Sequence, residues 1–170
     1  MNHYEQEWRF LVTKCPRIKS VPGVAIRQGY LSESGLTVRS RQYGDQGFLT
    51  IKSMFKTADE GPIARKEFEY AIPLKDAQEL IELSPASIVK TRYTFPNGFE
   101  IDFFHDRFEG LIIAEFEIHS DEYLHQPPPP MKGMEWINIT NDARYSNKSL
   151  SFGELPADTP SCILLNDLEL

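Results

Sequence analysis

Charged residues recur two apart within stretches of this chain that are otherwise apolar and aromatic. Successive side chains of a β-strand point to opposite faces, so a spacing of two places both charges on one side of a strand. The sets are Glu5, Glu7 and Arg9; Arg39 and Arg41; Arg65, Glu67 and Glu69; Lys90 and Arg92; Glu100 and Asp102; Glu115 and Glu117. Lys52 shares a strand face with the uncharged Thr50. This pattern predicts several strands that each carry one charged face.

Two kinds of chemistry fit such faces. Clustered guanidinium and ammonium groups repel one another unless an anion lies between them, and their N–H donors match phosphate oxygens well. Clustered carboxylates are the hard oxygen ligands that Mg²⁺ or Mn²⁺ prefers, with water and phosphate completing the coordination shell. If basic and acidic faces look at one another, they form a site for a polyphosphate and a divalent metal ion.

A simpler interpretation is that the charged faces are the solvated outer surface of a β-sandwich with cross-strand ion pairs. It accounts well for any single pair and less well for the whole set. The opposite strand faces carry enough Phe, Ile, Leu, Val and Tyr to need a cover of their own. The charges also sort by strand into basic pairs and acidic pairs. We therefore expect them to line a polar interior.

The strand pattern dominates the first two thirds of the chain. We expect strands at residues 4–12, 26–32, 36–43, 47–54, 64–72, 87–95, 98–104 and 111–118. Tight turns at 33–35, 44–47 and 96–98 make neighbouring strands antiparallel, and residues 59–62 form a longer break. The expected fold class is mainly β (α+β), a closed eight-stranded antiparallel β-barrel tunnel with helices packed outside, which leaves no exposed edge.

One helix is clear in the sequence, over residues 73–83. It has Pro near its start and apolar residues at helical spacing, and Ser84-Pro85 ends it. A weaker helix is expected over 13–25, and a helical turn around 141–150. The proline run at 127–130 has to be extended and cannot lie inside a sheet.

Length and charge limit the class of protein. The 170 residues are expected to form a single domain, residues 1–170, and the net charge is −7. A general nucleic-acid binder usually has a basic surface, so nucleic acid is not an expected partner. A local basic pocket for a small anion remains compatible with this charge.

The cysteines and the apolar segments indicate the compartment. Cys15 and Cys162 have no metal-ligand spacing, so we expect two free thiols in a reducing compartment, with a structural disulfide as the alternative. No apolar segment has the length of a signal-peptide core or of a transmembrane helix. We therefore expect a cytoplasmic protein with no membrane partner.

Taken in order, the motifs resemble those of the CYTH, or triphosphate tunnel metalloenzyme, superfamily. Glu5-Gln6-Glu7-Trp8-Arg9 is similar to its N-terminal ExExK signature. The resemblance continues through residues 28–31, 38–41, 49–52, 65–69, 90–92, 100–102, 110–117, 138–140 and 144–147. Each motif is weak by itself, but the ordered series is specific and covers the chain from about Tyr4 to Leu150.

The resemblance implies a tunnel-shaped barrel and a set of site residues. The implied substrate-binding residues are Arg9, Arg39, Arg41, Lys52, Arg65, Lys90 and Arg92. The implied ligands of Mg²⁺ or Mn²⁺ are Glu5, Glu7, Asp102, Glu115 and Glu117. Further tunnel acids, which would orient basic residues or outer-shell water, are Glu67 and Glu69. The implied catalytic residues are Glu5, Glu7 and Lys90.

One position departs from the signature, because Arg9 stands where the motif has Lys. The charge is kept, so a contact between Arg9 and the substrate is still expected. The guanidinium stays protonated, which disfavours a proton-transfer role for Arg9.

The family contains inorganic triphosphatases, thiamine triphosphatases, class IV adenylyl cyclases and RNA triphosphatases. We expect metal-dependent hydrolysis of a triphosphate, with inorganic tripolyphosphate as substrate, orthophosphate as product and water as nucleophile. Thiamine triphosphate is an alternative substrate. A class IV adenylyl cyclase, which makes cAMP and pyrophosphate, is less favoured because His3 precedes Tyr4 where those cyclases carry a His-Phe pair. A non-catalytic binder of nucleotides or polyphosphate would not need the carboxylates. A homodimer is left open.

Overall fold

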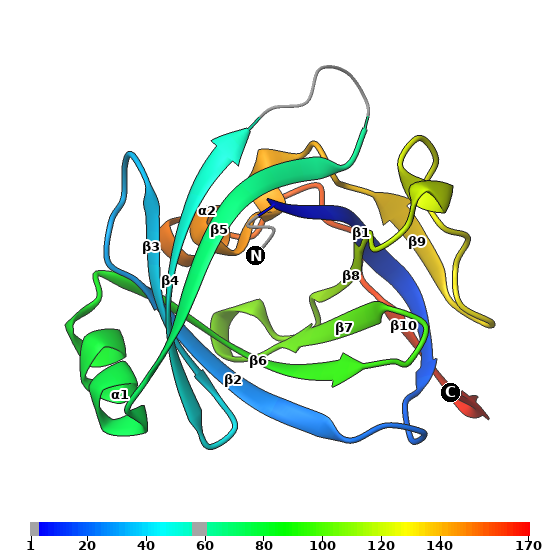
Figure 1. Ribbon diagram of the computed structural model, residues 1–170. Coiled ribbons are helices and arrows are strands. Elements are labelled where there is room, and N and C mark those ends of the chain that lie inside the picture. The colour runs from blue at the N-terminus through cyan, green and yellow to red at the C-terminus, as the bar shows by residue number, and fades with distance from the viewer. Residues whose placement is uncertain (1–3, 56–60) are drawn as a thin grey trace.

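The centre of the computed structural model, which describes residues 4–55 and 61–170, is a closed ring of eight strands (Figure 1). These strands are β1 (Tyr4–Arg17), β2 (Gly23–Tyr30), β3 (Thr37–Tyr43), β4 (Gln46–Phe55), β5 (Ile63–Ile72), β6 (Ala86–Thr94), β7 (Phe99–Phe104) and β8 (Ile112–Glu117). The ring order is β1-β5-β4-β3-β2-β6-β7-β8, and β8 pairs with β1 to close it. Every pairing in this ring is antiparallel, which confirms the predicted fold class.

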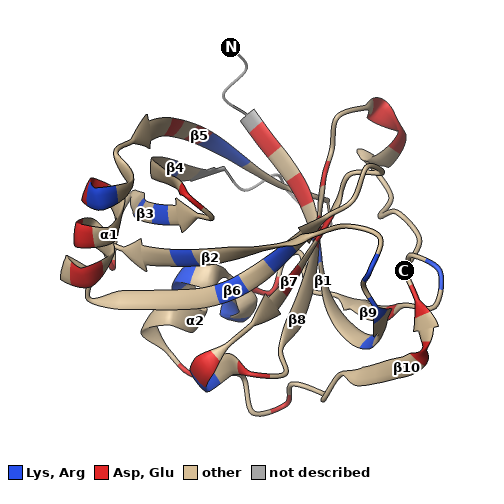
Figure 2. Cartoon of the chain, turned by 90° about the horizontal axis from the view of Figure 1, so that it is seen from below, with Lys and Arg blue, Asp and Glu red and all other residues tan. Residues whose placement is uncertain are grey.

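The strand register brings the charged faces together on the inside of the ring. Directly paired residues on neighbouring strands point to the same side of a sheet. The pairs include Glu5 with Arg65, Lys52 with Glu67, Arg92 with Asp102, and Arg9 with Glu115. Figure 2 shows acidic positions at the start of β1 and basic positions on β3, β5 and β6. The charged residues spaced two apart in the sequence therefore line one polar interior that these strands share.

The hairpin turns follow the sequence prediction. Gly35, Gly44 and Gly98 have φ values of 73°, 58° and 93°, in the left-handed region that glycine adopts at little cost. The predicted break at 59–62 cannot be compared in full, because residues 59 and 60 lie outside the described residues.

The weak helix predicted over residues 13–25 is wrong. β1 continues as a strand to Arg17, and β2 already begins at Gly23. The end of β1 pairs antiparallel with β9 (Glu135–Asn138) and parallel with β10 (Ile163–Glu169). Two prolines, Pro16 and Pro22, disfavour a helix in the residues before them, and the two late strands supply backbone partners.

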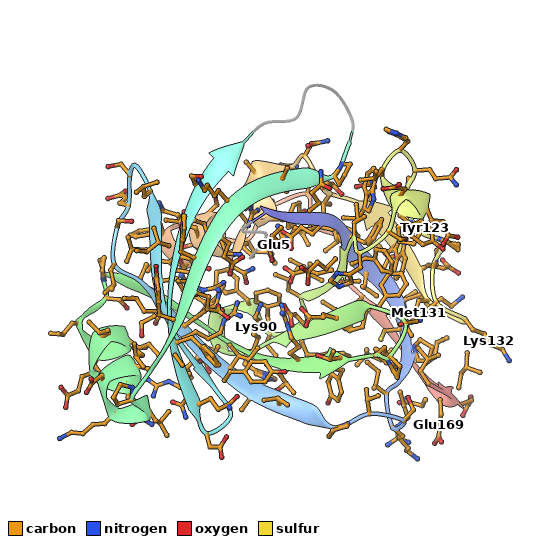
Figure 3. All side chains as sticks on the ribbon, in the orientation of Figure 1. Glu5, Lys90, Tyr123, Met131, Lys132 and Glu169 are labelled. Atoms are coloured by element: carbon orange, nitrogen blue, oxygen red, sulfur yellow. The ribbon has the colours of Figure 1, made fainter. Side chains whose placement is uncertain are left out.

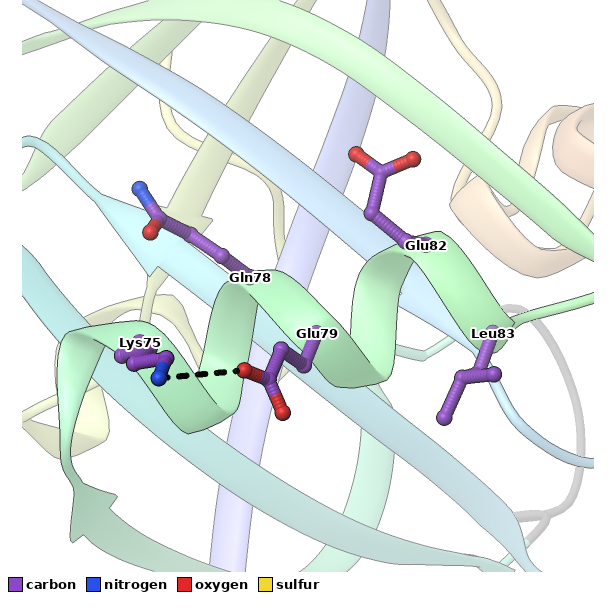
Figure 4. Close-up of a pocket in the computed structure, with 5 residues that line it drawn as sticks. All are labelled: Lys75, Gln78, Glu79, Glu82 and Leu83. Atoms are coloured by element: carbon purple, nitrogen blue, oxygen red, sulfur yellow. Dashed lines mark ion pairs between the residues drawn. The ribbon is translucent and has the colours of Figure 1, made fainter.

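The predicted helix is confirmed as α1 (Leu74–Leu83), which lies outside the barrel beside β2, β3 and β4 (Figure 1). It approaches β4 closely, because a Cβ at Gly47 would come within 2.9 Å of the Ala77 Cβ. Beneath the helix, Ser40 Oγ donates to the carbonyl of Ala77 at 3.0 Å. Figure 4 shows the opposite, solvent-facing side of α1, where a shallow pocket is bordered by Lys75 and Glu79. None of the predicted site residues borders this pocket.

An apolar cluster covers the outside of β1, β7 and β8. Trp8, Phe10 and Phe116 are buried there against the segment between β8 and β9. Trp136 stacks on Phe10 with 4.6 Å between ring centroids, and Trp8 Nε1 donates to the carbonyl of Tyr123 at 2.8 Å. The segment contains η2 (Asp121–Tyr123), and its proline run lies outside regular strands, as predicted. The apolar outer faces are thus covered by the C-terminal third of the chain as well as by α1.

A second apolar cluster occupies one end of the barrel interior. Inward-facing residues of four strands continue beyond the charged ones: Leu11, Ile88, Phe104 and Ile113. They pack against Tyr145 of η3 (Ala143–Tyr145) and Leu150 of α2 (Asn147–Phe152). The predicted helical turn around 141–150 is confirmed. Near it, η1 (Asp106–Phe108) joins β7 to β8 and contributes Phe108 to the cluster.

Two further expectations concern the cysteines and membranes. Cys15 and Cys162 are both free thiols, as predicted, and Cys15 is buried. In the part of the chain that the structure describes, no helix has the length and apolar character needed to cross a membrane.

Candidate functional site in the barrel interior

Arg92 is the centre of one charged cluster. Its Nε donates to Asp102 Oδ1 and its Nη2 to Asp102 Oδ2, both at 2.7 Å. Nη2 also donates to Glu115 Oε2 at 2.6 Å, and Nη1 contacts Glu100. Burial alone lowers the pKa of Arg92, but the charges of Asp102 and Glu115 raise that pKa well above its ordinary value. Arg92 is therefore a permanent cation held by three carboxylates.

Lys90 lies next to Arg92 on the same strand face and is fully buried. Its Nζ donates to Asp102 and, at 3.3 Å, to Asn147 Oδ1 on α2. The ammonium also lies 5.5 Å from the centroid of the Phe104 ring. Burial lowers the pKa of Lys90 to about 8, and the charge of Asp102 opposes that shift. Lys90 thus marks the boundary between the charged interior and its apolar end.

Arg9 connects the charged interior to the C-terminal segment. Its Nε donates to Glu115 Oε1 at 3.2 Å, and its Nη2 donates to the carbonyl of Tyr145 at 3.1 Å. The backbone N–H of Arg9 donates to Thr140 Oγ1 at 3.0 Å. Since the side chain is also buried, Arg9 holds β1, β8 and the residues before α2 together.

A second cluster lies on β1, β4 and β5. Lys52 Nζ is 2.8 Å from both Glu5 Oε2 and Glu67 Oε2. Burial raises the pKa of Glu5, but Lys52, a hydrogen bond with Glu67 and the charge of Arg65 together lower it to about 2. Burial and the adjacent Glu5 carboxyl raise the pKa of Glu67 instead. The two acids therefore compete for one ammonium group.

Arg39 joins this cluster from β3. Its Nη2 lies 3.5 Å from Glu69 Oε2 and 3.9 Å from Glu67 Oε1, and it donates to Thr50 Oγ1 at 3.1 Å. The Thr50 hydroxyl in turn donates to Glu69 Oε2 at 2.9 Å. The predicted tunnel acids Glu67 and Glu69 are thus in contact with basic residues, the arrangement that their predicted orienting role requires.

Glu7 is a buried carboxyl with other carboxylates around it. It pairs with Glu117 in the β1–β8 register and lies 3.6 Å, through Oε1, from Arg65 Nη2. Burial, followed by the charges of Glu115 and Glu5, raises the pKa of Glu7 to about 7. Burial and the charge of Glu5 also raise the pKa of Glu117, which lies at the edge of the interior. This group of acids would be stabilised by additional positive charge.

The acids provide the right donor chemistry for a hard divalent cation. Within residues 4–55 and 61–170, however, no three carboxylate, His or Cys side chains converge as they stand on one metal position. The reason is visible in the contacts, because Lys52, Arg65 and Arg9 occupy the carboxylate oxygens. A divalent ion would take over oxygens that these cations now contact.

Some guanidinium donors in the interior lack protein partners. Arg39 Nε and Arg65 Nε are buried without a hydrogen bond. Arg41 donates through Nε to Gln28 Oε1 at 3.1 Å, and among the described residues it forms no ion pair. Burial, with the charges of Arg39 and Arg92, lowers the pKa of Arg41 to about 10. Under-satisfied guanidinium groups on β3 and β5, the two strands that flank β4, are the donors that an anionic ligand needs.

Most of the predicted site residues therefore share one interior, although they do not share one cluster. Glu117 lies at the edge of this interior, with a side chain that is half exposed and 3.7 Å from His119 Nε2. Figure 3 shows Glu5 and Lys90 inside the ring, whereas Tyr123, Met131, Lys132 and Glu169 lie outside it. The prediction placed Thr50 on the same strand face as Lys52, but it missed three other uncharged residues of the interior, which are Gln28, Tyr30 and Asn147. The alternation of Ile26, Gln28 and Tyr30 along β2 was the available signal for two of them.

Comparison with known proteins matches this chain to a family model, to a relative in sequence and to solved structures. The family model of the CYTH domain matches residues 3–128. An inorganic triphosphatase of Acetivibrio thermocellus is 35% identical over 154 residues, which are 86% of this chain and 92% of that protein. The crystal structure of the inorganic triphosphatase NE1496 has a TM-score of 0.61 at 29% identity and covers 90% of this chain and 97% of its own. A further NE1496 structure, described as that of a hypothetical protein, has a TM-score of 0.62 at 30% identity and covers 89% and 99%.

Proposed function

Since this chain belongs to the CYTH domain family, we propose that it is a divalent-metal-dependent triphosphatase that hydrolyses inorganic tripolyphosphate to release orthophosphate. One observation carries the proposal. The barrel interior places guanidinium donors without partners beside carboxylates that repel one another. A polyanion with its metal ion would satisfy both at once.

The basic residues would bind the phosphate oxygens. Arg39, Arg41 and Arg65 have donors to spare, and Lys52 would exchange a carboxylate for phosphate. Lys90 and Arg92 lie deeper in the barrel interior, where the surrounding carboxylates fix the orientation of their side chains. Together these side chains would neutralise the phosphate oxygens of the bound substrate.

Glu5, Glu7, Glu115 and Glu117 are the residues that would hold Mg²⁺ or Mn²⁺. When bound, such an ion neutralises phosphate oxygens and lowers the pKa of a coordinated water. Asp102 stays a predicted ligand as well, and its present contacts to Lys90 and Arg92 support an additional role in orienting those two cations. Arg9 and the buried apolar end around Leu150 would keep bulk water from that side of the reacting groups.

The test is orthophosphate release from tripolyphosphate, thiamine triphosphate and ATP, each with Mg²⁺ and with Mn²⁺. We expect tripolyphosphate to be hydrolysed fastest. Lys75→Ala, on the outer side of α1, is the control and should match the parent protein. The appearance of cAMP and pyrophosphate from ATP would identify a cyclase instead. No release from any of the three substrates would contradict the proposal.

Three finer expectations accompany it. The packing of β9, β10 and α2 on the barrel supports one functional unit over residues 1–170. The free thiols of Cys15 and Cys162 support a cytoplasmic location. A homodimer stays a prediction, which light scattering of the purified protein would check.

A further inference from the structure

Arg41 differs from the other basic residues of the barrel interior. Ion pairs to carboxylates involve six of them: Arg9, Arg39, Lys52, Arg65, Lys90 and Arg92. In the described part of the chain Arg41 has none, and the one hydrogen bond of its side chain to protein runs from Nε to Gln28 Oε1 at 3.1 Å. Its two terminal nitrogens thus stay free for a ligand.

Gln28 is held so that its oxygen faces Arg41. The two residues are directly paired between β2 and β3. Gln28 is completely buried, and its Nε2 donates to the hydroxyl of Tyr30 at 2.8 Å. Because the amide nitrogen is engaged by Tyr30, the amide oxygen is left to accept from the guanidinium.

The neutrality of the amide matters for the charge of the interior. Arg92 is oriented by carboxylates, and these neutralise it while they hold it. An amide oxygen orients a guanidinium through a hydrogen bond and leaves its charge uncompensated. Arg41 is thus both fixed in direction and available as a full positive charge.

We propose that Gln28 is a positioning residue for Arg41, and that Tyr30 fixes the Gln28 amide so that the Arg41 guanidinium points its terminal nitrogens at a phosphate group of the substrate. This inference rests on the proposed triphosphate substrate. Gln28 itself does not touch the reacting atoms, so its effect reaches the substrate through Arg41 alone.

The principal variant is Gln28→Met, which keeps the length of the side chain and removes the amide. We expect the KM for tripolyphosphate to rise roughly tenfold, equivalent to about 1.4 kcal/mol. The value of kcat should stay within about twofold, because the lost interaction is one made equally in the ground state and the transition state. Gln28→Glu should raise KM further, since its carboxylate would pair with Arg41 and compete with phosphate. Tyr30→Phe should give a smaller rise, of about threefold, because only the fixation of the amide is lost.

Ser40→Ala is the matched control. Ser40 precedes Arg41 on β3, is also buried, and bonds the carbonyl of Ala77 on the outside of the barrel. Its loss should lower the melting temperature and leave KM unchanged. If Gln28→Met behaves in this way, with lower stability and an unchanged KM, the positioning role is overturned.

A double-mutant cycle separates this inference from the proposed activity. Tripolyphosphate binding is measured by titration calorimetry for the parent, Gln28→Met, Arg41→Ala and the double variant. We expect Gln28→Met to weaken binding by less than twofold once Arg41 is absent, because its effect runs through that residue. Equal weakening in both backgrounds would overturn the inference. If the parent protein binds tripolyphosphate but does not hydrolyse it, the proposed function is overturned, and the double-mutant cycle still tests the role of Gln28. If the parent protein does not bind tripolyphosphate, both the proposed function and the role of Gln28 are overturned.

Discussion

Arg92 and Asp102 face each other across β6 and β7 and are joined by two parallel hydrogen bonds of 2.7 Å. This is the bidentate geometry in which a guanidinium and a carboxylate fit best. Asp102 is completely buried and also accepts from Lys90, so one carboxylate serves two cations. The pair therefore holds the deep part of the interior in shape before any substrate arrives.

Removal of the Asp102 charge should leave two buried cations short of a partner. We expect Asp102→Asn to lower the free energy of unfolding by about 3 kcal/mol, because breaking a buried pair from one side leaves an uncompensated charge. Urea unfolding measures the change. Glu82→Gln is the control, since it breaks the exposed Arg27–Glu82 pair and should change stability by less than about 1 kcal/mol. Equal effects of the two substitutions would contradict the structural role of Asp102.

Glu7 should make the stability of the metal-free protein depend on pH. Its pKa is raised to about 7 from 4.5, so the fold favours the neutral carboxyl. The free energy of unfolding then falls as the pH rises from about 4.5 to 7, because the carboxyl ionises more readily in the unfolded chain. Glu7→Gln imitates the neutral form. We expect it to exceed the parent in stability by about 3 kcal/mol at pH 8 and to equal it at pH 4.

The control for this comparison is Glu79→Gln on the exposed side of α1, whose effect should be small at both pH values. Chemical unfolding in the presence of a chelator measures all three proteins. A Glu7→Gln variant that is less stable than the parent at pH 8 would mean that Arg65 and Arg9 keep Glu7 ionised.

Much of this arrangement could be predicted from the sequence, because a strand period of two is a local property. The alternation that places Arg39 and Arg41 on one face, or Glu115 and Glu117, needs no knowledge of the partner strand. The turn glycines, such as Gly35, are equally local. The barrel and its charged interior followed from these signals.

Contacts between distant parts of the chain could not be predicted in this way. Residues 13–17 became strand because β9 and β10 return more than a hundred residues later to pair with them. The hydrogen bond from Arg9 to the Tyr145 carbonyl has the same origin. Gln28 was missed for another reason. Its alternation with Ile26 and Tyr30 indicates only which face of the strand it lies on, and its role follows only once its partner Arg41 is known.

Removal of divalent metal should stop turnover and leave the barrel folded. The paired charges of Arg92 and Lys52 do not depend on a metal ion, so the far-ultraviolet circular dichroism should be unchanged by chelation. Orthophosphate release should fall by roughly a hundredfold or more, equivalent to about 2.7 kcal/mol of transition-state stabilisation. Restoring Mg²⁺ or Mn²⁺ should recover it, and the better of the two identifies the preferred metal.

The same ions should raise the melting temperature, because a ligand that binds only the folded state stabilises it. In Glu7→Gln this rise should be smaller, whereas Glu79→Gln should behave as the parent does. Full turnover after exhaustive chelation would contradict the assignment of metal dependence.

Leu150 tests whether the C-terminal segment closes one end of the interior as a structural element. Its side chain is completely buried against Phe104 and Tyr145, so Leu150→Ala leaves a cavity. We expect a loss of about 2–5 kcal/mol in the free energy of unfolding. Leu164→Ala, at a side chain that is 58% exposed on β10, is the control and should have little effect.

Since Arg9 and Lys90 both bond to this segment, the Leu150 variant should also lower kcat, measured at a temperature where it is fully folded. If kcat falls by the same factor in both leucine variants, the closed end has no specific influence on the site.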